Sequence, residues 1–111
     1  MTSGAQVLRE LINEGRAHLG RPRSAVESPF VSEHDATGRV TAVAWHPRAP
    51  VVITMADLES LGEVSQAPRM PDTGDLVVII YHPTGRTLLR VREFPSAEVV
   101  WAIESATYTT L

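Results

Sequence analysis

Apolar residues recur at three- and four-residue spacing near the start of the chain. This spacing places them on one stripe of a helix, which we expect over residues 3–19. The members of the stripe are Val7, Leu8, Leu11, Ile12 and Leu19. Ser3 and Gln6 have the spacing of a capping box at the start of this helix. Gly20 favours its end, because glycine readily adopts the left-handed conformation that closes a helix.

Alternation of apolar and polar residues predicts a pair of strands after this helix. The pattern places them at residues 26–33 and 39–46, joined by the turn Asp35-Ala36-Thr37-Gly38. Pro29 lies inside the first of these strands and has no N–H to donate. The first strand is therefore expected at a sheet edge, or bent.

The last third of the chain reads as strand throughout. Residues 76–81 are six consecutive apolar positions, which predict a central strand covered on both faces. Pro83-Thr84-Gly85 predicts a hairpin to residues 87–92, and residues 98–104 predict a further strand.

A second, short helix is predicted in the middle of the chain. Thr54 and Asp57 have the spacing of a cap, with the carboxylate near the positive end of the helix. Residues 66–75 contain two prolines and a glycine and predict the longest loop. Taken together, the pattern predicts a single α+β domain over residues 1–111. We expect about five strands in a mostly antiparallel or mixed sheet, an N-terminal helix and one short central helix.

Composition narrows the class of protein. The 111 residues are 43% apolar and 21% charged, as in ordinary globular proteins. No apolar run reaches the roughly 18 residues of a membrane span, and the start of the chain has no basic-then-apolar leader. We therefore expect a cytoplasmic protein without a membrane partner. The net charge of −3 disfavours nucleic acid, because proteins that bind it usually carry a basic excess.

Several catalytic signatures are absent from the sequence. It contains no G-x-G-x-x-G loop, no H-E-x-x-H, no C-x-x-C and no G-x-S-x-G elbow. Their absence excludes most nucleotide-dependent enzymes and most serine or thiol hydrolases.

The spacing of a histidine, a threonine and an aspartate in the middle of the chain does match a known motif in part. His46-Pro47 is followed by Thr54 eight residues after the histidine and by Asp57 eleven residues after it. This stretch, residues 43–58, resembles the core of the JAMM/MPN (Mov34-type) metalloprotease family, whose pattern is His-x-His-Pro, seven residues, Ser, two residues, Asp. The resemblance implies a zinc ion held by two histidines and the aspartate, with a glutamate from an earlier strand activating the bound water. The order of elements extends the resemblance over roughly residues 5–104.

The chain departs from the family pattern at the first metal histidine, at the serine and at the catalytic glutamate. Ala44 stands where the first metal histidine would be, and Thr54 replaces the serine. Glu27 and Glu33 are merely the nearest carboxylates to the position of the catalytic glutamate. His46 and Asp57 alone are one ligand short of the three that catalytic zinc normally requires. Thr54 and Asp57 are also fully explained as a structural helix cap.

We therefore expect a degenerate JAMM/MPN-like domain that acts as a non-catalytic protein-interaction or assembly module. It would have no catalytic residue and no cofactor, and its partner would be another protein or a second copy of the chain.

Two alternatives stay open at this point. The first is a zinc-dependent isopeptidase or peptidase with His46 and Asp57 as ligands, His34 as an optional third ligand, and Glu27 or Glu33 as base. The second is a regulator that binds nucleic acid through a strand face carrying three arginines. These are Arg86, Arg90 and Arg92.

Overall fold

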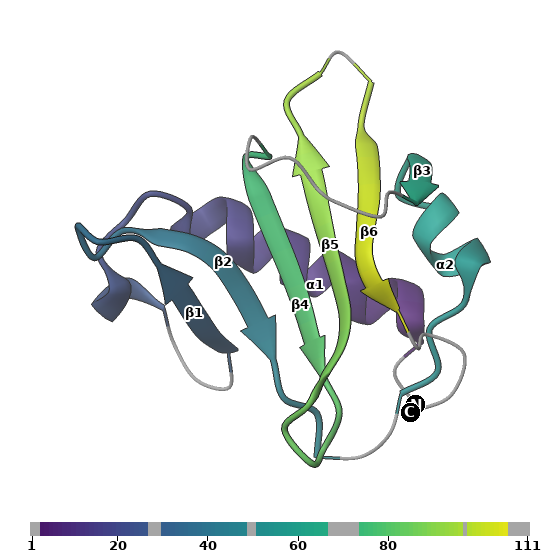
Figure 1. Cartoon of the computed structure of the whole chain (residues 1–111), viewed down its shortest axis with the longest axis horizontal. Helices are drawn as coiled ribbons and strands as arrows, with labels where there is room; N and C mark the ends of the chain where they lie inside the picture. Colours follow the sequence, from purple (N-terminus) through teal and green to yellow (C-terminus); the bar gives the residue numbers. More distant parts are fainter. Residues whose placement is uncertain (1–2, 27–29, 49–50, 67–73, 97, 107–111) are drawn as a thin grey trace.

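Six strands form one sheet, and a long helix lies across one of its faces (Figure 1). The computed structural model describes residues 3–26, 30–48, 51–66, 74–96 and 98–106. The elements are α1 (Gly4–His18), the 3₁₀ turn η1 (Arg23–Ala25), β1 (Phe30–His34), β2 (Val40–Trp45), α2 (Met55–Glu59), β3 (Glu63–Gln66), β4 (Leu76–Tyr81), β5 (Thr87–Phe94) and β6 (Val100–Ala106). None of the helices in this part of the chain is long and apolar enough to cross a membrane.

The sheet is mixed, with the strand order β1-β2-β4-β5-β6-β3. The pairs β1–β2, β4–β5 and β5–β6 are antiparallel, whereas β2–β4 and β3–β6 are parallel. Between β2 and β4 the chain passes through α2 and β3, because parallel neighbours require a crossover. The predicted α+β class is confirmed. The predicted count of five strands is one too low.

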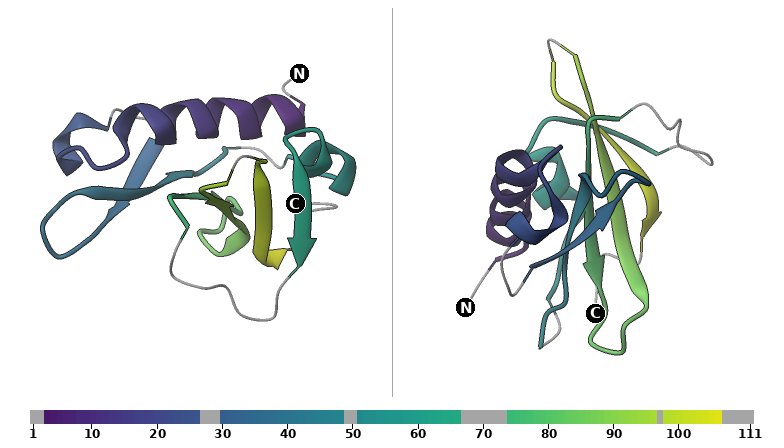
Figure 2. Two further views of the ribbon diagram at one scale, coloured as in Figure 1. Left: turned by 90° about the horizontal axis from the view of Figure 1, so that it is seen from above. Right: turned by 90° about the vertical axis from the view of Figure 1, so that its left-hand side faces the viewer.

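Most of the core lies between the sheet and the two helices. Leu11 of α1 and Leu58 of α2 belong to one buried cluster, together with Val78 and Ile80 of β4. Figure 2 shows α2 beside the N-terminal end of α1, on the same side of the sheet. Gly15 permits a close approach of α1 to the sheet, since a Cβ there would lie 2.5 Å from a methyl carbon of Leu76.

A second, smaller cluster covers the opposite face of the sheet. Its buried members are Ala42, Ala44, Val77 and Ile79, with Tyr81 packed against them. β4 therefore contributes alternate residues to both clusters, and all its residues from Leu76 to Ile80 are buried. The prediction that residues 76–81 form a central strand is confirmed.

The ends of several elements differ from the prediction. The first strand is predicted from residue 26 and is described from Phe30; residues 23–25 form the turn η1, and residues 27–29 lie outside the described residues. The predicted short central helix is α2, which has only five residues, since Gly62 (φ 146°) follows soon after it and leads directly into β3. The predicted loop at 66–75 lies mostly outside the described residues, which omit 67–73.

Candidate functional site

Thr54 and Asp57 form a reciprocal cap at the start of α2. Thr54 Oγ1 accepts a hydrogen bond from the Asp57 amide (3.2 Å), and Asp57 Oδ2 accepts one from the Thr54 amide (2.9 Å). The same carboxylate lies against the start of α1, where a Cβ on Gly4 would be 2.5 Å from Oδ2. The Asp57 carboxylate is thus held at the N-terminal ends of both helices, where their partial positive charges favour an anion.

His46 is held in a different part of the molecule. Its ring stacks on Tyr81, with 4.2 Å between ring centroids and 7° between planes. Tyr81 packs on the second cluster, which covers the face opposite the helices. Ala44 also belongs to that cluster. It precedes His46 by two positions, and alternate residues of an extended chain face the same side of a sheet.

The sheet therefore separates His46 from Asp57. The histidine lies with Tyr81 on one face, whereas α2 packs with α1 on the other. His34 lies opposite Val40, at the far end of β2 from His46. Val40 and His46 are six positions apart along an extended chain, which corresponds to roughly 20 Å. His34 is therefore too far from His46 to share a metal ion with it. Within the described residues, no three His, Asp or Glu side chains gather closely enough to hold a metal ion.

Of the two carboxylates considered as a catalytic base, Glu27 and Glu33, the structure describes only Glu33. Glu27 lies outside the described residues. Glu33 Oε2 is 3.3 Å from Nη2 of Arg90. Arg90 also pairs with Glu104, and Arg92 Nη2 lies 3.4 Å from the other oxygen of Glu104. We call these four residues the ionic bridge.

The ionic bridge spans the face opposite the helices. Arg90 is on β5 and Glu33 on β1, with β4 and β2 between them. On this face Glu33 lies opposite Ala42 of β2 and Arg90 lies opposite Ile79 of β4, and both of these neighbours belong to the second cluster. The bridge engages two of the three arginines considered for nucleic-acid binding, while Arg86 is exposed in the turn between β4 and β5.

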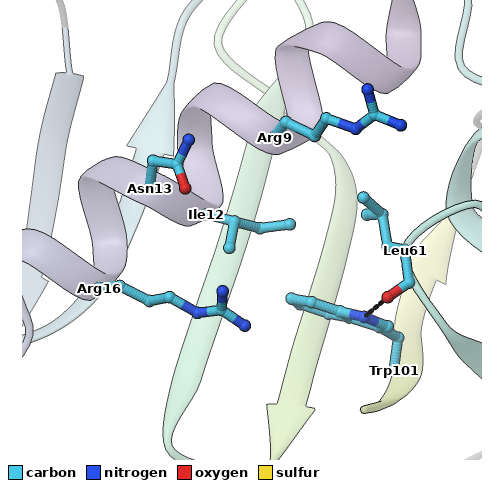
Figure 3. A pocket seen from close by; sticks show the side chains of 6 residues that line it. All are labelled: Arg9, Ile12, Asn13, Arg16, Leu61 and Trp101. Atoms are coloured by element: carbon cyan, nitrogen blue, oxygen red, sulfur yellow. Dashed lines mark hydrogen bonds between the residues drawn. The ribbon is translucent and has the colours of Figure 1, made fainter.

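A hollow of about 220 Å³ lies between α1 and the end of the sheet that carries β6 (Figure 3). Its lining residues are Arg9, Ile12, Asn13, Arg16, Leu61 and Trp101. Trp101 is 2% exposed, and its indole N–H donates to the Leu61 carbonyl (3.3 Å). Arg16 is paired with Glu93. None of the six lining side chains is a nucleophile or a general base, so this hollow has no catalytic set.

A larger hollow, of about 340 Å³, lies along β1. Its lining residues are Arg23, Val26, Phe30, Val31, Ser32 and His34. Among the described strands, β1 pairs only with β2, so its other edge has no strand beside it. Val31 is 45% exposed, and only Val52 is comparable among the large apolar residues described. We call β1 and this hollow the β1 edge.

Acidic and basic side chains occupy opposite ends of the β1 edge. At the Phe30 end, a further hollow of about 260 Å³ is lined by Phe30, Asn13, Glu10 and Glu14. At the other end, Arg23 Nη1 lies 3.5 Å from Nε2 of His34.

Pro29 predicts a sheet-edge position for the first strand, but the linear sequence carries no signal for the hollow beside it. The strand's neighbours on the helix side come from α1 and η1, and a linear pattern does not reveal them.

Comparisons of the chain with family models, with curated proteins and with solved structures found no match. The geometry of the chain's own residues is therefore the basis for assigning a function.

Proposed function

We propose that this protein is a non-catalytic protein-interaction module that binds an extended polypeptide segment along the β1 edge. The observation that carries the proposal is an edge strand with one unpaired side, which begins with Phe30 and the exposed Val31 and lies beside a hollow that also includes Val26. An added strand gains main-chain hydrogen bonds from such an edge and places alternate side chains in the adjoining hollow.

The choice of β1 over β3 depends on the chemistry of the two edge strands. β3 is four residues long and carries the exposed residues Glu63, Ser65 and Gln66, with only Val64 half-buried. Short, charged edge strands are the usual protection against unwanted pairing. β1 instead leaves Val31 exposed and places Phe30 at a hollow, as expected of an edge that receives a partner.

The arrangement of the family-like residues supports a non-catalytic role within a degenerate JAMM/MPN-like architecture. His-Pro at the end of β2, a capped α2 and an apolar β4 follow one another in the order that the resemblance implies. However, Asp57 is used as a helix cap and His46 as a stacking partner of Tyr81. Each therefore has a structural use, and among the described residues neither belongs to a group of three His, Asp or Glu side chains that could hold a metal ion.

Selection of short random peptides displayed on phage tests this proposal with a defined probe. We expect the chain to select peptides with alternating apolar residues, and we expect Val31→Lys to abolish their binding. A lysine on a strand edge opposes strand addition. Val52→Lys is the matched control, because Val52 is similarly exposed (54%) but lies outside the β1 edge. Selected peptides that bind Val31→Lys and the unmodified chain equally well would refute the proposal.

A further inference from the structure

We infer that the segment received by the β1 edge is β1 of a second copy of this chain, paired antiparallel across a two-fold axis. This inference depends on the proposed function, because it names the partner for the same surface. The pairing would join two six-stranded sheets into one continuous sheet. An interface of this kind is isologous, so each contact occurs twice and the same surface must be complementary to itself.

The charges at the two ends of the β1 edge provide this complementarity. Glu10 and Glu14 lie at the Phe30 end, whereas Arg23 and His34 lie at the other end. Antiparallel pairing of two β1 strands brings the Phe30 end of each copy to the His34 end of the other. Two acidic-to-basic contacts therefore form across the axis. Among the described residues, neither Arg23 nor His34 is paired with a carboxylate within the chain.

The residues of β1 are also compatible with their own antiparallel partner. With Ser32 on the axis, Phe30 lies opposite His34 and Val31 lies opposite Glu33 of the other copy. The Phe30–His34 pair joins two aromatic rings, which favours cross-strand contact. A carboxylate beside Val31 would ordinarily oppose association, but Glu33 is already paired with Arg90 in the ionic bridge. The Phe30–His34 pairs therefore favour this register, and the ionic bridge already neutralises the carboxylate that faces Val31.

Charge reversal and mixing test this arrangement directly. The association of the full chain is measured by sedimentation velocity over a wide range of protein concentration. We expect a reversible dimer, and we expect Glu14→Arg and Arg23→Glu each to weaken association by at least about tenfold through like-charge contacts. An equimolar mixture of the two variants should regain dimerisation, because the reversed charges then face one another. Arg86→Glu, which changes an exposed arginine away from β1, should dimerise like the unmodified chain.

The outcomes separate this inference from the proposed function. Restored dimers in the mixture alone support the two-fold pairing and also show that both variants fold. A dimer that survives both single reversals would overturn the inference, because its interface must then lie elsewhere. A chain that stays monomeric at every concentration, yet loses peptide binding on Val31→Lys, would overturn the dimer and leave the proposed function in place. A monomeric chain that selects no peptide would overturn both.

Discussion

Substitution of Ala44 by histidine would restore the His-x-His-Pro pattern, and the structure predicts destabilisation in place of a gain of metal. Ala44 is 1% exposed and lies between Val31 on β1 and Ile79 on β4. An imidazole there adds a whole ring to a filled cluster, which typically costs about 1–3 kcal/mol. Its ring nitrogens would lack partners, which adds about 1–3 kcal/mol. We expect a total loss of about 2–6 kcal/mol.

Urea unfolding followed by tryptophan fluorescence, with and without zinc, measures this effect. Thr41→His is the control, since Thr41 is exposed on the same strand and its substitution should change stability by less than about 0.5 kcal/mol. Zinc should stabilise neither variant, because His46 and Asp57 lie on opposite faces of the sheet. A zinc-dependent rise in the unfolding midpoint of Ala44→His alone would refute this reasoning, since only binding to the native state stabilises it by mass action.

Three further predictions concern stability. Ile79→Ala should cost about 2–4 kcal/mol in urea unfolding, because Ile79 is fully buried, and a loss below about 1 kcal/mol would contradict its central place. Thr54→Ala should cost about 0.5–2 kcal/mol and Thr54→Ser almost nothing, so equal thermal melts of the two would disprove the cap. Hydrogen bonds from the Thr37 side chain and from the Arg39 and Thr37 amides lower the pKa of Asp35. The unmodified chain should therefore be more stable than Asp35→Ala above the ordinary carboxyl pKa, and this advantage should disappear as the pH falls through the lowered pKa. An advantage that stays constant down to strongly acidic pH would contradict this account.

The sequence predicted those elements that are specified by local signals, such as apolar spacing, a helix cap or a turn motif. The helical stripe was predicted at 3–19 and is found at Gly4–His18, because its apolar spacing and Ser3 cap are local signals. The hairpin of β4 and β5 followed from an apolar run and a proline–glycine turn. In contrast, β3 has one apolar residue, and it is a strand because it pairs in parallel with β6.

The arrangement of the candidate site could not be predicted from spacing. His46 and Asp57 are eleven residues apart, and the intervening chain passes from one face of the sheet to the other. The ionic bridge joins Glu33 to Arg90 over fifty-seven positions of sequence, and such pairs depend on strand order. The strand order includes two parallel pairings, which no turn motif encodes.

The central claim is that β1 pairs with β1 of a second copy of this chain, and one disulfide cross-link tests it most directly. The chain has no cysteine, so a single Ser32→Cys substitution introduces a unique thiol at the centre of β1. Directly opposite Cβ atoms in an antiparallel pair lie about 4.5–5.5 Å apart, close enough for a disulfide after small shifts. Under mild oxidation we predict a covalent dimer for Ser32→Cys and a monomer for Ser65→Cys on the other edge strand. A monomeric Ser32→Cys chain, or equal cross-linking of both variants, would contradict the account.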